Sequence, residues 1–270
     1  MNKYKDRGYL NEDFKLFYIV DNKAMDFELH YHRFHKVLIF LGGNVTYYIE
    51  GRNYILSPYD VVLVGAGDIH RPIVNDSSRY ERIIMYLSPE LFAGVDLIPL
   101  FKCFQHSREN NSNLIHIDGR IEQIEQFKEI IEQLADSSGD CTDFRGIHQK
   151  AHIIDFLIHL NNYILNEKNV FELEYVSNPK IVSAIEYINL HLTESLTVDS
   201  IADSLYISPS YLMHLFKTET GYTLMNYIEK KRLFAANSLI ARGMSKTEAC
   251  YQSGFKNYAA YYYANKKNKC

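Results

Sequence analysis

The chain has 270 residues, of which 47% are hydrophobic and 14% aromatic, so it is long enough for about two domains with apolar cores. Its formal net charge of −4 excludes a generic nucleic-acid coat. The charge is uneven: residues 179–270 carry 11 Lys and Arg against 7 Asp and Glu, and the remainder carries 18 against 26. Phosphate contacts need positive charge, so the C-terminal third is the part suited to nucleic acid. A solvated basic tail is the simpler explanation for part of that surplus.

The sequence shows no sign of a membrane segment or a disulfide framework. No stretch approaches the ~20 apolar residues that a membrane helix needs, and the N-terminus lacks the apolar region of a signal peptide. Four scattered cysteines lack metal-binding spacing and are typical of reduced thiols: Cys103, Cys141, Cys250 and Cys270. These features predict a cytoplasmic protein with no membrane partner.

Short apolar runs dominate the first half of the chain. They extend from Phe27 to Leu87, beginning with an expected strand over 27–32, and turn signals rich in Gly, Pro, Asn and Asp separate them. An alternation over 14–20 suggests an additional arm or edge strand. Regularly spaced short strands predict a sandwich or small barrel, so residues 1–118 are expected to form one β-domain.

Two amphipathic helices are expected next, over 120–134 and 144–166, because apolar residues recur there with helical spacing. They must cover the β-domain or each other, and a remaining apolar stripe would serve dimerisation. We therefore expect a coupling and dimerisation segment at 119–166. The polar stretch 167–178 is expected to be a linker, ending at the break before Pro179.

Residues 197–217 show the pattern of a helix-turn-helix unit. Thr197 and Ser208 are candidate N-caps, and Pro209 suits the first position of the second helix. Each helix has one apolar stripe, and a plain three-helix packing unit would show the same pattern. In a DNA-binding unit the second helix presents its outer face to the major groove. The residues on that face are Ser210, Met213, His214 and Lys217.

The same plan recurs about 48 positions later, over 245–266. Ser245 is again a candidate N-cap, and Glu248 would complete a capping box. A long amphipathic helix over 223–242 lies between the copies, with Gly221 and Gly243 at the helix-stop positions. Two units on one rigid helix can reach successive major-groove segments, roughly 34 Å apart. The second set of candidate DNA-binding residues is Asn257, Ala259, Tyr262, Tyr263 and Lys266.

The C-terminal residues resemble the DNA-binding domain of the AraC/XylS transcription regulators over about 179–267. The matching residues are Ile201-Ala202, Ser208–Leu212, Leu215–Lys217, Gly221–Thr223, Tyr227, Arg232-Leu233, Ala236 and Gly254-Phe255. With His30–His32, Glu50-Gly51, Leu56–Asp60 and Ile69–Pro72, residues 27–87 resemble, less specifically, the cupin-type sensor domain of the same family. The resemblance implies promoter DNA, a small-molecule effector (sugars being a common class) and a second copy of the chain as partners. It also allows a contact with RNA polymerase.

Two departures from the family pattern concern the second unit. The family usually has Phe where Asn265 stands, in a core position, and it continues with a Gly-Thr-Pro-Tyr-Arg tail beyond Lys267. We therefore expect a looser second unit with weaker or partner-dependent DNA binding. A third alternative is that DNA binding is lost and the chain acts as a sensor or a heterodimer partner.

Histidines mark the candidate effector site. His30 and His32 lie two apart on an expected strand, so both point to one face, and His70 lies on a later strand or turn. In metal-binding cupins such histidines join a glutamate to hold a metal, but Lys36 stands where that glutamate would lie, and its ammonium repels a divalent cation. We predict no metal or other cofactor. The expected effector-binding residues are His30, His32, Tyr47, His70 and Arg71.

Together these features predict an α+β protein of two domains. An N-terminal cupin-like β-barrel carries appended helices, and an all-α domain over 179–270 holds two helix-turn-helix units. The predicted function is ligand-responsive regulation of transcription, without enzymatic activity. The alternative is a metal-dependent cupin enzyme with a helical appendage.

Overall fold

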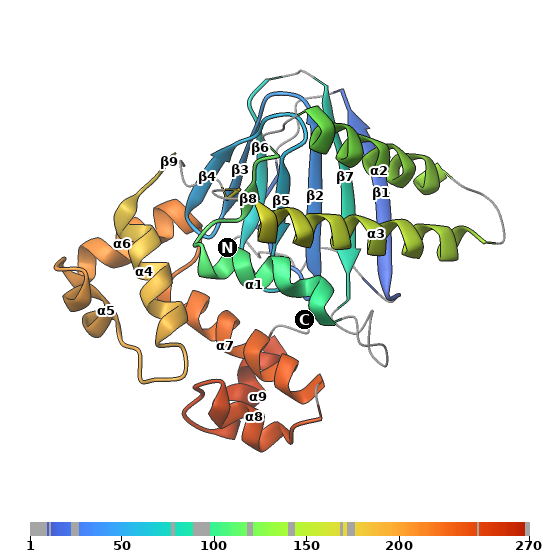
Figure 1. Cartoon of the computed structure of the whole chain (residues 1–270). Helices are drawn as coiled ribbons and strands as arrows, with labels where there is room; N and C mark the ends of the chain where they lie inside the picture. Colours follow the sequence, from blue (N-terminus) through green and yellow to red (C-terminus); the bar gives the residue numbers. More distant parts are fainter. Residues whose placement is uncertain are drawn as a thin grey trace. The chain divides into compact units, whose positions relative to one another are not determined.

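The computed structural model describes residues 10, 12–22, 27–76, 79–88, 98–117, 121–139, 144–167, 170–171, 176–241 and 243–267. The chain divides into a β-rich unit, Met1–Ile49 with Asn53–Val176, and a helical unit, Glu50–Arg52 with Ser177–Cys270. Figure 1 shows both units, with the strands in the first and a series of short helices in the second.

Two sheets form the β-rich unit, with strand orders β1-β7-β2-β5-β8 and β6-β3-β4-β9. A cluster that includes Leu38, Tyr47 and Val62 is buried between them. The expected sheet-rich, cupin-like fold of the N-terminal part is therefore confirmed, although no ladder among the described residues closes the two sheets into a continuous barrel. The strands are β1 Phe14–Asp21, β2 His35–Gly42, β3 Val45–Ile49, β4 Arg52–Ile55, β5 Val61–Val64, β6 His70–Val74, β7 Tyr80–Leu87, β8 Leu114–Ile115 and β9 Val176–Ser177.

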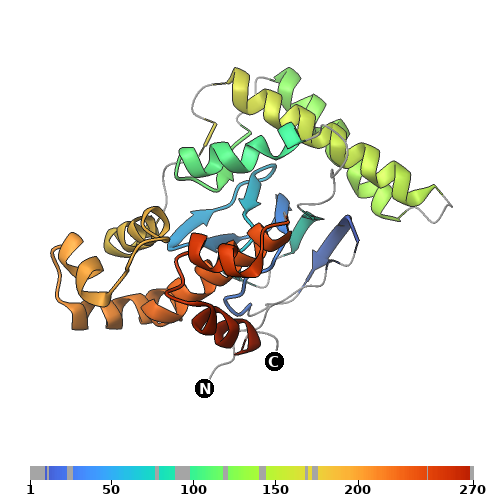
Figure 2. The ribbon, with the colours of Figure 1, turned by 90° about the horizontal axis from the view of Figure 1, so that it is seen from below.

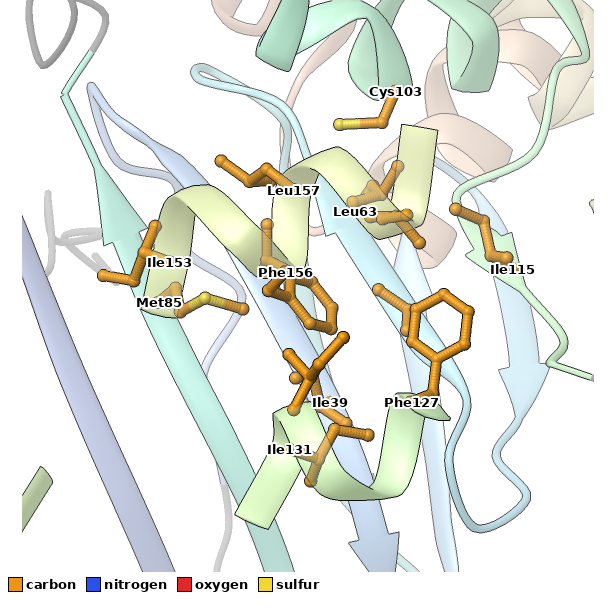
Figure 3. Close-up of a cluster of buried hydrophobic side chains, with 14 of the residues drawn as sticks. Ile39, Leu63, Met85, Cys103, Ile115, Phe127, Ile131, Ile153, Phe156 and Leu157 are labelled. Atoms are coloured by element: carbon orange, nitrogen blue, oxygen red, sulfur yellow. The ribbon is translucent and has the colours of Figure 1, made fainter. Parts of the chain in front are cut away.

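The larger sheet has apolar side chains on both faces. Alternation along β2 places Leu38 and Phe40 between the sheets and Val37 and Ile39 on the opposite face. Helices cover that opposite face, and Figure 3 shows Phe127 and Phe156 lying over Ile39. Figure 2 shows the two longest of these helices side by side. The covering elements are the 3₁₀ helix Ile98–Phe101, α1 Lys102–Glu109, α2 Ile121–Gly139 and α3 Arg145–Asn166.

Two local expectations for this unit differ from the structure, and one helix had not been expected. The expected strand over 27–32 is reduced to a bridge between His30 and His70. Helix α1 was not predicted, because its apolar residues are too few to show helical periodicity. Within the expected linker, Val170 and Phe171 are buried in the core, and the carbonyl of Val170 accepts a hydrogen bond from the amide of His116 at 3.0 Å.

The helical unit contains the two predicted helix-turn-helix copies. Ser208 caps α6 with Pro209 in its first turn, and Thr197 caps α5 in a capping box with Ser200. Ser245 caps α8, but the Glu248 carboxylate accepts from Gln252 Nε2, so only one arm of the predicted second box forms. The helices are α4 Pro179–Leu190, α5 Val198–Ser204, α6 Pro209–Thr220, α7 Leu224–Ala241, α8 Lys246–Gln252 and α9 Tyr258–Lys267.

The turn of each copy needs one residue in the left-handed region. Tyr206 supplies it in the first copy with φ 54°, and Gly254 supplies it in the second with φ 86°. A Cβ at Gly254 would lie 2.4 Å from the carbonyl oxygen of Leu192, so only glycine fits there. The repeat inferred from sequence is thus confirmed in backbone conformation.

Helix α7 joins the two copies and packs against both. The rings of Phe216 on α6 and Tyr227 on α7 form an edge contact, with centroids 5.3 Å apart. The hydroxyl of Tyr261 on α9 lies 3.2 Å from Asn237 Oδ1 on α7. Arg232 on α7 donates from Nε to the carbonyl of Leu192 at 2.9 Å, which fixes the loop between α4 and α5. These contacts give the helical unit its own core.

Candidate nucleic-acid interface and effector site

The outer face of α6 carries the first set of predicted DNA-binding residues. Leu212 and Phe216 are buried on the inner face, which leaves the opposite side of the helix to solvent. All four predicted residues are exposed: Ser210, Met213, His214 and Lys217. A helix with one buried face and a mixed polar outer face can offer hydrogen bonds to base edges and a cation to phosphate.

Helix α9 carries the second set on its exposed side. Tyr261 and Ala264 are buried, and the predicted residues Ala259, Tyr262, Tyr263 and Lys266 are exposed on the helix, with Asn257 in the preceding turn. Asn257 also has a structural role, because its Oδ1 accepts a hydrogen bond from the amide of Ala260 at 2.9 Å. This face is more aromatic than that of α6.

Sequence reasoning missed several tyrosines beside these faces. Tyr206, in the first turn, is 96% exposed, and Tyr211, Tyr251 and Tyr258 are also exposed. An aromatic residue placed outside the buried stripe of its helix was the signal that could have found them. Their hydroxyls add hydrogen-bonding groups beside both outer faces.

The second copy is formed, although one core position is polar. Phe255, Tyr261 and Ala264 are buried with Leu233 and Ala236 of α7. Asn265 is half-buried, and its Nδ2 lies 3.5 Å from the hydroxyl of Tyr261. The amide thus takes the place of an apolar side chain at the edge of this core, which is the position where we expected looser packing.

Inside the β-rich unit, the predicted histidines do meet. The ring centroid of His70 lies 4.3 Å from that of His30 and 4.7 Å from that of His32. Tyr47 stacks on His70 at 6.1 Å. His32, His70 and Tyr47 are almost fully buried, whereas His30 is partly exposed at the edge of the cluster. Four of the five predicted effector-binding residues therefore form one group.

Arg71, the fifth, lies on the other face of its strand. In the pairing of β3 with β6, His70 faces Ile49 and Arg71 faces Tyr48. Ile49 belongs to the cluster buried between the sheets, so alternation directs Arg71 away from that interior. Its adjacency in sequence to His70 does not bring it into the same group.

Lys36 belongs to the same cluster, although the sequence predicts for it only the repulsion of a metal ion. It is buried, and its ammonium donates a hydrogen bond to the hydroxyl of Tyr47 at 2.8 Å. Burial, with a smaller contribution from the Arg82 guanidinium, lowers the pKa of Lys36 to about 7. Arg82 itself is neutralised by Asp21, at 2.6 Å.

Burial also keeps the two interior histidines neutral. It lowers the pKa of His32 and of His70 well below 6.5, and the nearby charge of Lys36 lowers both further. Among the described residues, no three His, Cys, Asp or Glu side chains are placed to hold a metal ion. The cluster offers hydrogen bonds and one buried cation.

A cavity of about 610 Å³ lies elsewhere in the same unit. Its lining includes Tyr18 of β1, Leu41 of β2 and Lys128, Ile131 and Glu132 of α2. None of the predicted effector-binding residues lines it.

Two family models match this chain. The AraC-like ligand binding domain matches residues 17–140, and the helix-turn-helix domain matches residues 201–269. The first includes strands β2 to β8 with the buried cluster, and the second includes both copies from Ile201 onward, with their exposed faces. The chain belongs to the AraC family. As in other AraC-family proteins, a cupin-like ligand-binding domain precedes a helical DNA-binding domain. The chain is a ligand-responsive, DNA-binding transcription regulator.

The curated relatives align with most of this AraC-family chain. The HTH-type transcriptional activator RhaS of Citrobacter koseri is 25% identical over 85% of this chain and 80% of its own length. RhaS of Escherichia coli O127:H6 is also 25% identical, over 86% of this chain and 81% of its own. Among solved structures, ToxT from Vibrio cholerae O395 is 14% identical, covers 94% of this chain and 93% of its own, and has a TM-score of 0.36.

The two RhaS relatives are transcriptional activators, which favours a regulator over the metal-dependent enzyme that the sequence left open. Among the described helices, none is both long and apolar enough to cross a membrane. The two described cysteines, Cys103 and Cys250, are free and buried.

Proposed function

We propose that this regulator reads promoter DNA with the outer faces of α6 and α9 while the buried cluster of the β-rich unit binds its effector. The observation that carries the first half is the exposure of all nine predicted contact residues. Both faces belong to one unit, on either side of α7, whose 18 residues span about 27 Å. That length is of the order of the 34 Å between successive major-groove segments.

The outer faces of α6 and α9 differ in the kinds of DNA contact that their side chains can make. His214 and Ser210 can form hydrogen bonds with base edges, whereas Lys217 and Lys266 supply charge for phosphate. The tyrosines of α9 add hydroxyl contacts to the backbone and apolar surface. We infer that α6 contributes most of the sequence discrimination and α9 contributes mainly affinity.

The experiment is the selection of genomic DNA fragments by the purified full-length protein, with and without candidate metabolites. A shared sequence motif among the bound fragments, with an occupancy that changes with one metabolite, supports the proposal. The paired change His214→Ala and Lys217→Ala should abolish the enrichment, whereas Glu219→Gln, exposed on the same helix away from that face, should leave it. Enrichment that survives the paired change would contradict the assignment of α6.

We also propose that the chain acts as a homodimer, through the helical segment 119–166. Helix α3, with its N-cap Phe144, has a second apolar stripe in which Ile154 is half-buried and the other members are exposed. From Phe144 to Ile158 its members recur at alternating three- and four-residue steps, which is the spacing of a coiled-coil seam, and Leu165 follows seven residues later. The stripe is Phe144, Ile147, Ala151, Ile154, Ile158 and Leu165. A second copy of α3 is its natural partner.

Sedimentation of the full-length protein tests the dimer. Ile158→Glu should yield a monomer, whereas Asn166→Glu, exposed on the same helix but outside the stripe, should leave the dimer intact. A dimer that survives Ile158→Glu would contradict this assignment.

By analogy with the activator relatives, we propose that the DNA-bound dimer contacts RNA polymerase. Transcription in a purified system would test this contact.

A further inference from the structure

Three polar groups inside the β-rich unit have hydrogen-bonding capacity that no described residue takes up. Nε2 of His32 and Nε2 of His70 are buried without a hydrogen-bond partner. The ammonium of Lys36 is buried, bonds to the hydroxyl of Tyr47, and has no carboxylate partner among the described residues. A buried polar group without a hydrogen-bond partner destabilises the folded state. A ligand that supplies the missing partners would explain why three such groups lie together here.

The two histidines accept hydrogen bonds at this site. Nδ1 of His32 lies 2.6 Å from the carbonyl oxygen of Phe34, and Nδ1 of His70 lies 3.0 Å from that of Asp68. A carbonyl only accepts, so each Nδ1 carries the proton, and each neutral ring has its lone pair at Nε2. The partner that both rings lack is therefore a donor, such as a hydroxyl group.

Lys36 lacks an anionic hydrogen-bond acceptor, whereas the two histidines lack a donor. The other buried cation nearby, Arg82, is paired with the carboxylate of Asp21, so the charge of Lys36 is the unbalanced one. Burial lowers its pKa to about 7, which measures how poorly the interior tolerates that charge. A carboxylate would supply both a countercharge and acceptors for the remaining N–H groups.

We propose that the cluster recognises a small hydroxycarboxylate, whose carboxylate binds Lys36 and whose hydroxyl groups donate to Nε2 of His32 and His70. This inference rests on the proposed function, in which the β-rich unit binds the effector, and it names the effector's chemical class. A neutral polyol leaves Lys36 unbalanced, and a fatty acid leaves both imidazoles without donors. His30, partly exposed and with its ring centroid 4.3 Å from that of His70, lies at the side of the cluster that reaches solvent.

Calorimetric titration of the full-length protein tests the class with three kinds of probe. The hydroxycarboxylates are glycerate and gluconate, their neutral polyols are glycerol and glucitol, and their hydroxyl-free acids are propionate and hexanoate. We expect at least one hydroxycarboxylate to bind about tenfold or more tightly than its polyol and its hydroxyl-free counterpart. Equal binding of the polyol or of the plain acid, or no binding by any hydroxycarboxylate, overturns the proposal.

Two variants show whether the binding uses this cluster. Lys36→Met should abolish the binding of the hydroxycarboxylate, whereas Lys102→Met, an exposed lysine of α1, should leave it unchanged. Binding that survives Lys36→Met overturns the proposal, as does stoichiometric metal held by His32 and His70. The titration needs no DNA, so its failure is separate from that of the proposed function. A neutral effector found by fragment selection would refute the hydroxycarboxylate and leave the regulator intact.

Discussion

The two units keep their functional groups in opposite places. In the β-rich unit the polar groups lie inside, where Lys36, His32 and His70 are buried between two sheets. In the helical unit the interior is apolar around residues such as Phe216, and the polar groups stand on the outer faces of α6 and α9. A small ligand can be enclosed and must be met by buried groups, whereas a duplex is too large to enclose and must be met at the surface. Stability and function are therefore coupled in the first unit and separable in the second.

The largest effect should come from removing an apolar core residue of the helical unit. Phe216→Ala deletes a fully buried ring that contacts Tyr227, and it should lower the free energy of unfolding by about 3–5 kcal/mol. Urea unfolding followed by circular dichroism measures this change. Thr218→Ala, exposed on the same helix, is the control and should shift the midpoint little. A loss of less than 1 kcal/mol for Phe216→Ala would mean that this core does not support α6.

The opposite sign is expected for the buried cation of the β-rich unit. Lys36→Met removes an uncompensated charge and should raise the free energy of unfolding at pH 6 by about 1–4 kcal/mol, with effector binding lost. The pKa of Lys36 is lowered from 10.5 in the unfolded chain to about 7, so between these pH values the unfolded state binds more protons. The stability of the native chain therefore rises with pH across that window, and the advantage of the variant shrinks.

Urea unfolding at pH 6 and at pH 9 measures this difference, with Lys102→Met as the exposed control. The native chain and Lys36→Met share every other titratable or charged group around position 36, so the difference between their stabilities reports on Lys36. These shared groups are Asp21, His30, His32, His35, Tyr47, His70, Tyr80, Arg82 and Tyr86. A variant less stable than the native chain at pH 6 would show that the charge of Lys36 is compensated in the folded protein.

A smaller effect, confined to DNA binding, should follow a change on the outer face of α6. His214→Ala should weaken binding to the selected site by about 1–3 kcal/mol and relax the preference at one base pair. Its unfolding free energy should stay within about 0.5 kcal/mol of the native value, because His214 is exposed. Fluorescence anisotropy with the site and its single-base variants measures both. Unchanged base preference would remove His214 from direct readout.

The smallest effect concerns salt dependence. Lys217→Met and Lys266→Met should each reduce the slope of log affinity against log salt concentration by about 0.9, since each removes one phosphate contact. Binding isotherms at several salt concentrations give the slope, with Lys102→Met as the control in the other unit. A slope that changes for Lys217 alone would show that the second copy does not reach the phosphate backbone.

Much of the helical unit could be predicted because its determinants are local. Thr197, Ser208 and Pro209 start their helices where the sequence indicated, and the periodicity around Leu212 and Phe216 separated the buried from the exposed side. In the β-rich unit the strands were predictable, but the sequence alone does not show that the register places Arg71 on the other face of β6 from His70. The sequence predicts Asn257 as a contact residue, and only the structure shows that its side chain also caps α9.

The sequence by itself therefore determined the two units, the repeat and the outward faces of α6 and α9, because helix caps and helical spacing act within a few residues. Only the tertiary structure decided what lies between the sheets. It brings Lys36 of β2 to Tyr47 of β3, and both into the neighbourhood of His70 of β6. Strand pairing joins residues that are distant in the chain, and a one-residue difference in register moves a side chain to the other face.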